Sequence, residues 1–404
     1  MPHTPKDTSG RRPRVAALVT EYRKYSHGQN IVDRLMGGYG WESRWHHPAL
    51  DVISLYVDQF PESDLSRERE ARHADLRIYP TIAEALTLGG GELAVDGVLL
   101  IAEHGDYPVN EKGQTLYPRY EFFCQAIEVF RASGRSVPVF CDKHLSWNWE
   151  WATEMVATSR ELGFPLMAGS SLPVTRRIPS IDMPMGAQVE EIVGLGVGGI
   201  DSYDVHALEA MQCLVERRQG GETGVVSIQA LRGDSVWQAL DDGAWSADLF
   251  EACLCRSFSL APADESHRHT YPTREELPQL VGSPPVAYRI EYADGLRGTM
   301  FLMEGLVSDI TAAARIADRP DPLSLLFYLG SGHHMQPNFF NPLCHHIEEL
   351  IVNNRPPYPV ERTLLTTGLS GAGVESLWLG EKPLATPHLN ISYQVAEAST
   401  YRRT

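Results

Sequence analysis

The sequence predicts an α/β protein in which a doubly wound parallel sheet is followed by a second, α+β domain. Short apolar runs alternate with segments of helical period through residues 14–177. The pattern changes after residue 177, where later apolar runs are expected to form a largely antiparallel open sheet. The length of 404 residues also exceeds what one hydrophobic core usually supports, so two domains are expected.

The first domain reads as strands and helices in alternation. Strands are expected at 14–20, 51–57, 77–79, 95–102, 136–141 and 165–168. Helices are expected at 28–36, 64–73, 81–86, 118–133 and 147–162. Gly37 and Gly38 end the first helix, and Thr81 with Glu84 has the spacing of a capping box. The alternation favours parallel strands with helices packed on the sheet.

The second domain is expected to span residues 178–404, and residues 1–13 are expected to form a disordered tail. Pro179 and Pro184 lie in a segment, 178–185, that is typical of a linker. Strands are expected at 189–197, 225–230, 286–292, 298–304 and 325–328. Helices are expected at 203–217, 342–352 and 360–367.

Composition excludes several classes of function. The net charge of −17 argues against general binding to nucleic acid or anionic membranes, because both require a basic surface. No apolar run approaches the roughly 18–20 residues that span a bilayer, and the run at 15–19 is too short for a secretion signal. The six cysteines include no CxxC pair. We therefore expect a cytoplasmic protein that acts on a small molecule.

Titratable side chains follow the expected fourth and fifth strands directly. Ligands of open parallel sheets bind outside the carboxyl ends of the strands, so these side chains should lie in a crevice. Catalysis is expected of His104, Asp142 and His144, and substrate binding of Asp106 and Tyr107. Two further candidates for substrate binding, Arg176 and Asp204, lie later in the chain.

Three histidines at neighbouring strand ends also suggest a metal site. His27 follows the first strand, so it should approach His104 and His144 in a doubly wound sheet. With Glu103 they would suit a divalent ion such as zinc, manganese or iron. The same side chains could instead bind a polyhydroxylated substrate, take part in acid–base chemistry, or form only local hydrogen bonds.

Other histidines occur as adjacent pairs, among them His46-His47 and His345-His346. Adjacent residues rarely chelate one ion. No metal site is expected from either pair.

The segment 141–169 resembles part of the glucose-fructose oxidoreductase / inositol dehydrogenase / MocA (Gfo/Idh/MocA) family. Cys141-Asp-Lys-His144 is similar to the end of that family's strand bearing Glu-Lys-Pro, and Gly163-Phe-Pro-Leu-Met-Ala-Gly169 is similar to its next strand. Residues 95–102 resemble the preceding strand, and residues 203–209 resemble a second-domain helix bearing His-x-x-Asp. The resemblance implies a Rossmann-like first domain and an NAD(P)-dependent oxidoreductase acting on a hydroxyl or keto compound, such as a sugar or polyol derivative. It also implies a homodimer or homotetramer.

The resemblance assigns roles to three residues. Lys143 matches the family's active-site lysine and His206 its catalytic histidine. Asp58 matches the acidic residue that holds the adenosine ribose. A lysine in this position can help move the proton of a hydroxyl group, although Lys143 could also simply form an ion pair with Asp142 or Glu103.

The sequence departs from the family at the dinucleotide fingerprint. Gly-x-Gly-x-x-Gly should follow the first strand, but residues 20–28 carry Tyr22, Arg23 and Tyr25, which would obstruct a pyrophosphate. Three alternatives therefore stay open. The first is an oxidoreductase that still uses NAD(P), and the second is a metal-dependent, non-redox lyase, isomerase or hydrolase in which a histidine-rich site replaces the nucleotide. The third is a binding protein without catalysis.

Overall fold

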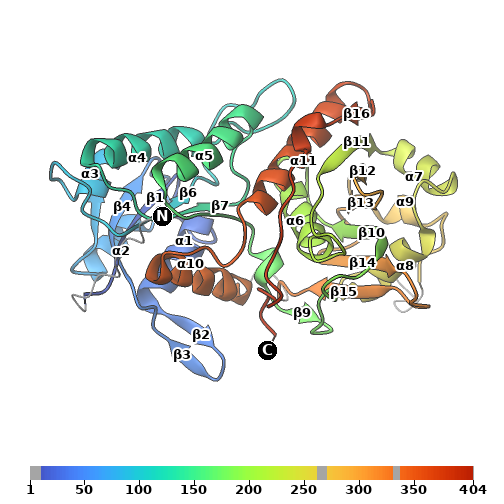
Figure 1. Cartoon of the computed structure of the whole chain (residues 1–404), viewed down its shortest axis with the longest axis horizontal. Helices are drawn as coiled ribbons and strands as arrows, with labels where there is room; N and C mark the ends of the chain where they lie inside the picture. The colour runs from blue at the N-terminus through green and yellow to red at the C-terminus, as the bar shows by residue number, and fades with distance from the viewer. Residues whose placement is uncertain (1–10, 262–270, 331–336, 404) are drawn as a thin grey trace.

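A computed structural model of the chain describes residues 11–261, 271–330 and 337–403, and it contains two sheets, each packed against helices (Figure 1). A six-stranded parallel sheet forms the first domain, and an eight-stranded, mostly antiparallel sheet forms the second. The predicted fold class is confirmed.

The first sheet has the order β5-β4-β1-β6-β7-β8, with every pair parallel. Its strands are β1 (Arg14–Val19), β4 (Asp51–Val57), β5 (Arg77–Tyr79), β6 (Gly97–Ile101), β7 (Val139–Asp142) and β8 (Leu166–Gly169). The order reverses at β1, which lies between β4 and β6. The crevice at such a reversal is where doubly wound sheets bind ligands.

Helices cover both faces of this sheet. On one side lie α3 (Ile82–Thr87), α4 (Arg119–Ser133) and α5 (Trp149–Leu162), and on the other lie α1 (His27–Gly37) and α10 (Asn341–Asn353). The expected cap of α3 is present, because Thr81 Oγ1 accepts from the Glu84 N–H at 3.1 Å. Helix α10 lies within the range expected for the second domain, yet its apolar face packs on the first sheet.

Smaller elements complete this domain. Helix α2 (Ser66–Arg72) precedes β5, and the hairpin of β2 (Tyr39–Trp41) and β3 (Arg44–His46), which the apolar pattern does not reveal, extends beside α10. Most of the expected tail, residues 1–10, lies outside the described residues. Arg11 and Arg12 form ion pairs with Asp96 and Asp51 at 2.9 and 2.8 Å.

The second sheet has the order β16-β11-β12-β13-β10-β14-β15-β9. Its strands are β9 (Arg177–Ile178), β10 (Val189–Gly196), β11 (Val225–Arg232), β12 (Val286–Tyr292), β13 (Arg297–Leu302), β14 (Ile310–Ile316), β15 (Leu323–Phe327) and β16 (Leu384–Ala385). Only β10 and β13 pair in parallel. Strands β9, β14 and β16 were not expected from the sequence.

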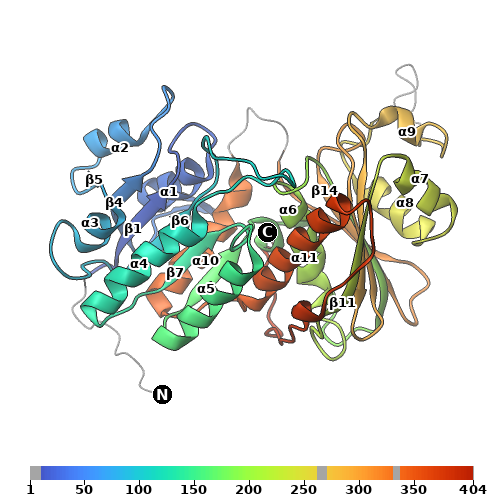
Figure 2. The ribbon, with the colours of Figure 1, turned by 90° about the horizontal axis from the view of Figure 1, so that it is seen from above.

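Both faces of the second sheet are covered. Helices α6 (Asp204–Val215) and α11 (Glu361–Trp378) lie on the face toward the first domain, while α7 (Asp234–Asp241), α8 (Ala247–Arg256) and α9 (Leu277–Leu280) lie on the outer face (Figure 2). Helix α11 continues well beyond the expected end at residue 367. Three short 3₁₀ turns are Leu172–Val174, Asn338–Phe340 and Pro387–Leu389.

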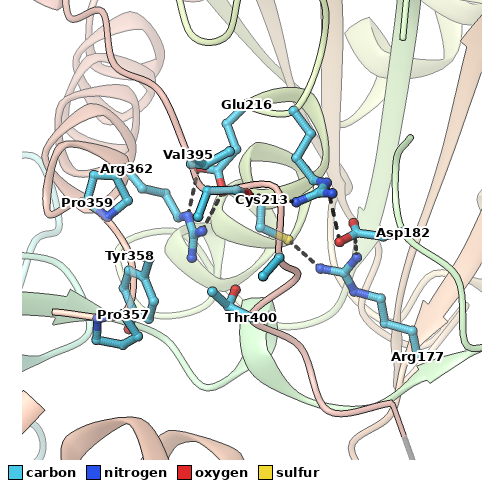
Figure 3. A pocket seen from close by; sticks show the side chains of 13 residues that line it. Arg177, Asp182, Cys213, Glu216, Pro357, Tyr358, Pro359, Arg362, Val395 and Thr400 are labelled. Carbon is cyan, nitrogen blue, oxygen red and sulfur yellow. Dashed lines mark hydrogen bonds and ion pairs between the residues drawn. The ribbon is translucent and has the colours of Figure 1, made fainter. Parts of the chain in front are cut away.

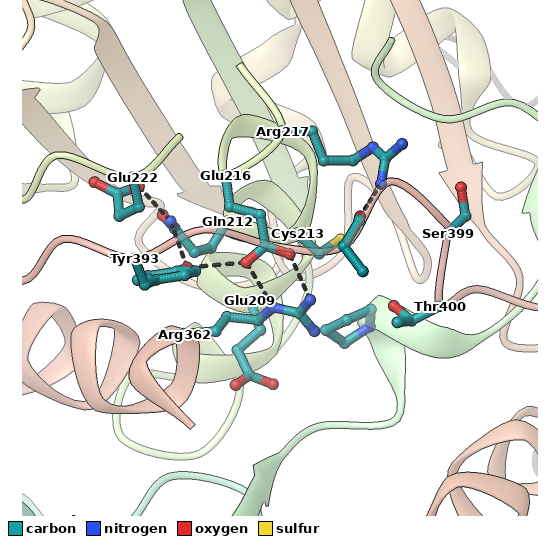
Figure 4. Close-up of polar contacts among 12 residues, drawn as sticks. Glu209, Gln212, Cys213, Glu216, Arg217, Glu222, Arg362, Tyr393, Ser399 and Thr400 are labelled. Atoms are coloured by element: carbon teal, nitrogen blue, oxygen red, sulfur yellow. Dashed lines mark hydrogen bonds and ion pairs between the residues drawn. The ribbon is translucent and has the colours of Figure 1, made fainter. Parts of the chain in front are cut away.

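A buried polar network holds α6, α11 and the C-terminal segment together (Figure 4). Arg362 Nε donates to Glu216 Oε2 at 2.9 Å, and the Tyr393 hydroxyl donates to the same carboxylate oxygen at 2.9 Å. The neighbouring cavity (Figure 3) measures about 20 Å³ and is lined by arginines 177, 217 and 362 among others. That volume holds about one water, so this cavity is too small for a sugar-sized substrate.

Within the described ranges, none of the helices combines the length and the apolar character needed to cross a membrane.

Candidate active site

Three histidines meet at the carboxyl ends of the first sheet's strands. His27 is the first residue of α1, His104 follows β6, and His206 reaches across from α6 of the second domain. The His27 ring centroid lies 5.6 Å from that of His104 and 6.4 Å from that of His206. The two domains therefore both place imidazoles at this end of the first sheet.

The backbone helps to place these side chains. His104 lies shortly after the end of β6 and has a φ of 76°. Lys143 directly follows β7 and has a φ of 61°. Residues other than glycine adopt such left-handed conformations rarely, and they do so mostly where the surrounding structure holds them. In the case of Lys143, its N–H donates to the Gly169 carbonyl at 3.2 Å, which extends the pairing of β7 with β8.

A buried carboxylate, Glu103, organises the charges of the site. One of its oxygens accepts from Lys143 Nζ and the other from Arg119 Nη2, the latter at 2.8 Å. All three side chains are at most 7% exposed. Burial alone would raise the pKa of Glu103, but the charges of Lys143 and Arg119 outweigh it and hold this pKa below its usual value.

Lys143 is placed to bridge the domains. Besides its ion pair with Glu103, its Nζ lies 3.3 Å from the Ser202 carbonyl oxygen of the second domain. The alternative of a simple ion pair is thus realised with Glu103 and not with Asp142. An ammonium group with three donors can still offer a proton to a substrate oxygen from this position.

His27 and Asp142 form a hydrogen-bonded dyad. His27 Nδ1 lies 2.7 Å from Asp142 Oδ2, and the Asp142 side chain is 1% exposed while that of His27 is 16% exposed. A carboxylate that accepts from Nδ1–H selects the tautomer in which Nε2 is unprotonated. His27 is therefore oriented as a proton acceptor at the site.

His206 is oriented in the opposite sense. Its Nδ1 lies 2.5 Å from Ser170 Oγ, and that oxygen already accepts from the Leu172 N–H at 3.1 Å. In the tautomer in which the Ser170 hydroxyl donates to Nδ1, Nε2–H of His206 is a donor. Burial first, and then the charges of Lys143 and His27, lower the pKa of His206 well below its usual value.

Glu209 supports this arrangement from one turn further along α6. Its carboxylate accepts from the Ser170 N–H at 2.5 Å and from the Thr363 hydroxyl at 2.6 Å. Burial raises the pKa of Glu209 to about 7, although these two hydrogen bonds oppose the rise. The carboxyl group is therefore poised to change charge near neutral pH.

His144 does not join the other histidines. Its Nε2 lies 3.2 Å from Arg119 Nη1, which can only donate, so the lone pair of His144 is engaged. Burial and then Arg119 lower the pKa of this histidine well below its usual value. His144 thus orients Arg119 and is not free to bind a metal.

The expected metal site, His27, His104, His144 and Glu103, is consequently not assembled. Among the described residues, no three members of this set have ligand atoms within 4.8 Å of one another. Two buried ring nitrogens of this set, His104 Nε2 and His144 Nδ1, have no hydrogen-bond partner in the described ranges. Because His144 Nε2 accepts from Arg119, its Nδ1 carries the proton of the neutral ring, so His104 Nε2 is the nitrogen left with an unused lone pair. Burial lowers the pKa of His104 to about 4, so the ring is neutral at pH 7.

The expected substrate-binding residues are either hydrogen-bonded to other residues or exposed to solvent. Tyr107 donates to Asp58 at 2.6 Å, and Asp106 is exposed with its backbone paired to Gln59. Arg176 is exposed as well. Asp204 is fully buried and accepts from Ser370 and Tyr288, at 2.7 and 3.2 Å, so it supports α6 from inside the second domain.

The residues at the nucleotide crevice do not fit a dinucleotide held by a glycine loop. Tyr22 fills the turn after β1, is fully buried and donates to Asp33 at 2.8 Å. Asp58, the expected ribose ligand, accepts from Tyr56 on one oxygen and from Tyr107 on the other, both at 2.6 Å. One feature of the fingerprint remains, because a Cβ on Gly28 would approach the Glu21 carbonyl oxygen to 3.0 Å.

Several residues of the site gave little sign of their role in the sequence. Arg119 begins an ordinary amphipathic helix, and nothing in the helical pattern shows that its side chain turns inward. Ser170 follows an expected strand end, the signal that identified His104 and Lys143. Glu209 lies three residues after His206, where the resembling family has an acidic residue.

This order of strands, followed by a largely antiparallel second sheet, is the two-domain fold of the Gfo/Idh/MocA family, as the resemblance predicted. A myo-inositol 2-dehydrogenase from Lactobacillus plantarum matches with a TM-score of 0.56 and 11% identity, over 93% of this chain and 99% of that chain. A myo-inositol dehydrogenase from Lactobacillus casei, solved with NAD(H) and myo-inositol, matches with a TM-score of 0.56 and 12% identity, over 92% and 96% of the two chains. GenD2 from gentamicin A biosynthesis, solved with NAD, has a TM-score of 0.56 at 12% identity, over 95% of this chain and 99% of that chain. No protein-family model matches the sequence, and no curated protein does.

Proposed function

We propose that this protein is an oxidoreductase-like enzyme that acts at a hydroxyl or keto carbon of a sugar- or polyol-like molecule. The observation that carries this proposal is the pairing of an oriented proton acceptor, His27, with two oriented donors, Lys143 and His206, at the junction of the domains. Its similarity in fold to two myo-inositol dehydrogenases supports the substrate class.

The residues suggest a division of labour. His27 Nε2 accepts the proton of a substrate hydroxyl, while Asp142 stabilises the imidazolium that forms. Lys143 and the Nε2–H of His206 donate hydrogen bonds to the substrate oxygen and stabilise the charge that develops there. Glu103 and Arg119 hold Lys143 in place.

A dehydrogenation also requires a hydride acceptor, for which NAD is a common cofactor, and two proteins of similar fold were solved with NAD or NAD(H). Two features argue against an ordinary NAD(P) site. Tyr22 fills the loop after β1, and both carboxylate oxygens of Asp58 already accept hydrogen bonds from tyrosines. These features favour a second candidate, a non-redox lyase, isomerase or hydrolase that uses the same proton-transfer groups. A divalent metal at the histidines belongs to this second candidate, although His144 and Glu103 have other partners.

Two measurements separate the candidates. NAD(H) and NADP(H) are titrated by fluorescence, and myo-inositol, aldoses and their keto derivatives are incubated in D₂O and followed by NMR. Saturable nucleotide binding with substrate-dependent reduction of NAD(P) is expected for the oxidoreductase. Deuterium incorporation or loss of water without nucleotide binding would instead establish the non-redox enzyme.

A matched pair of variants ties either activity to the site. His27→Gln should abolish turnover, whereas His73→Gln, at the C-terminus of α2, should leave it unchanged. Equal activity of the His27 variant and the wild type would remove the proposed proton acceptor. Turnover absent from the wild type over the whole panel would favour a binding protein.

Assembly and location also remain proposals. A homodimer or homotetramer fits the resembling family, and a cytoplasmic location fits the sequence. Helices cover both faces of the second sheet, so contacts between subunits would have to use another surface. Light scattering of the purified protein measures the mass, and cell fractionation tests the location.

A further inference from the structure

A second group of histidines lies away from the Lys143 site, between the hairpin β2–β3 and helix α10. His46 comes from β3, and His345 and Glu348 come from α10. One ligand atom of each residue lies within 4.8 Å of the others, which is the only such group of three or more among the described residues. Figure 1 shows the hairpin extending from the first domain beside α10.

The helix and the hairpin explain how these side chains meet. His345 and Glu348 are three residues apart, so they project from the same face of α10. His46 Nε2 lies 2.6 Å from Glu348 Oε2, and the other oxygen of Glu348 accepts from the Ala49 N–H at 2.7 Å. The carboxylate is thereby held in one orientation with one oxygen turned toward the histidines.

The His345 ring is also fixed. It stacks on Trp41 of the hairpin, with centroids 4.2 Å apart and an interplanar angle of 23°. It meets the His46 ring edge-on, at a centroid distance of 5.7 Å. Ordered rings of this kind lower the entropic cost of gathering ligands around an ion.

Two buried polar atoms at this group lack partners. His345 Nδ1 has no hydrogen bond in the described ranges, and neither does the hydroxyl of Tyr39. Tyr39 is 2% exposed, and its ring centroid lies 5.2 Å from that of His46. Buried polar atoms without partners cost stability, and the Glu348–His46 hydrogen bond alone satisfies neither atom.

We propose that His46, His345 and Glu348 bind a divalent transition-metal ion, with zinc the best match. Two imidazole nitrogens and one carboxylate oxygen form a ligand set that zinc accepts, with water as the fourth ligand. A ring nitrogen of His345 would bind the ion through its lone pair. The water on the ion would offer a hydrogen-bond partner to the Tyr39 hydroxyl. The site would fasten the hairpin to α10.

This fastening has a structural consequence for the neighbouring site. Helix α10 begins at Asn341, which accepts from Arg34 Nε of α1 at 2.8 Å. The preceding residue, Phe340, packs edge-on against His27 with centroids 5.0 Å apart. The proposed ion would therefore anchor the helix that borders His27, without touching the reacting atoms.

The test begins with the full chain, dialysed against a chelator and then reloaded with zinc. One equivalent of tightly bound zinc by elemental analysis, with a higher temperature of unfolding, is expected for the wild type. His345→Gln and Glu348→Gln should each weaken zinc binding more than about 100-fold, since even loss of an outer-shell partner costs 10–100-fold. His47→Gln and Glu349→Gln, adjacent in sequence but outside the ligand set, should retain it.

Three outcomes would overturn the proposal: a wild type that binds no zinc after loading, control variants that lose zinc as completely as the ligand variants, or zinc that is lost in His104→Gln. The last result would place the ion at the Lys143 site instead. If the ligand variants do not fold, cobalt(II) added to the wild type still decides the matter. Absorption bands typical of four-coordinate cobalt with nitrogen and oxygen ligands are expected, and a spectrum of octahedral aqueous cobalt would contradict it.

Discussion

His27 and Asp142 are hydrogen-bonded at 2.7 Å across the carboxyl ends of β1 and β7, although they lie 115 positions apart in the chain. Asp142 is almost fully buried, while His27 is 16% exposed and its ring centroid lies 6.4 Å from that of His206 in the second domain. In the mechanism proposed above, this dyad would accept a proton from a substrate at the junction of the domains.

The first prediction concerns this dyad. Asp142→Asn should lower turnover by roughly 10²–10⁴-fold with little change in KM, because an amide can donate to Nδ1 and leave the proton of His27 on Nε2. Steady-state kinetics with the substrate found above measures the effect. Asp51→Asn, at the opposite end of the sheet, is the control, and a similar loss there would point to a general effect on folding.

The second prediction concerns the buried charges around Glu103. Glu103→Gln should cost about 3–5 kcal/mol of unfolding free energy, because Lys143 and Arg119 would be left as two buried cations without their shared anion. Lys143→Met should cost clearly less, since the Glu103–Arg119 pair survives, but it should abolish turnover. Chemical denaturation measures both variants, and a larger loss of stability for Lys143→Met would contradict this assignment.

The third prediction is a pH dependence of stability caused by Glu209. Burial raises its pKa from 4.5 to about 7, so the folded state binds more protons than the unfolded state between these two values. The contribution of Glu209 is thus favourable at low pH and is lost as the pH rises toward 7. Relative to Glu209→Gln, the wild type should lose up to about 3 kcal/mol across this window. Parallel curves of unfolding free energy against pH for the two proteins would show that Glu209 does not titrate there.

The fourth prediction concerns Gly169, whose φ of 126° places a glycine where β8 meets the second domain. A Cβ at this position would lie 2.7 Å from Glu209 Oε1 and 2.8 Å from Thr363 Oγ1. Gly169→Ala should therefore displace the Glu209 carboxylate and lower both stability, by about 1–3 kcal/mol, and turnover. Gly163→Ala is the matched control, because its φ is also positive but no atom lies within 4 Å. Equal losses in thermal stability would attribute the effect to backbone strain alone.

The first domain was largely predictable because its strands are buried on both faces. The runs at β1 and β6 are continuous apolar segments, and the structure leaves residues 15–19 without solvent exposure. A strand that is buried on both faces appears in the sequence as a continuous apolar run, so it can be recognised from local sequence alone. The hairpin β2–β3 was not predicted, since Trp41 and His46 belong to no apolar alternation, and their ring contacts with His345 come from α10, which is distant in the sequence.

The sequence alone determined that polar groups would gather at the strand ends, because in a parallel sheet every such end faces the same edge. It could not determine which partner each group would find. Lys143 and His144 are neighbours in the chain, yet one binds Glu103 and the other binds Arg119, a residue that the helical pattern does not mark. In the sequence, His46 and His345 each stand beside another histidine, and only the packing of α10 on the hairpin brings them to Glu348. Hydrogen bonds and metal ligation require atoms within a few ångströms of one another, and that proximity is decided by how distant segments pack.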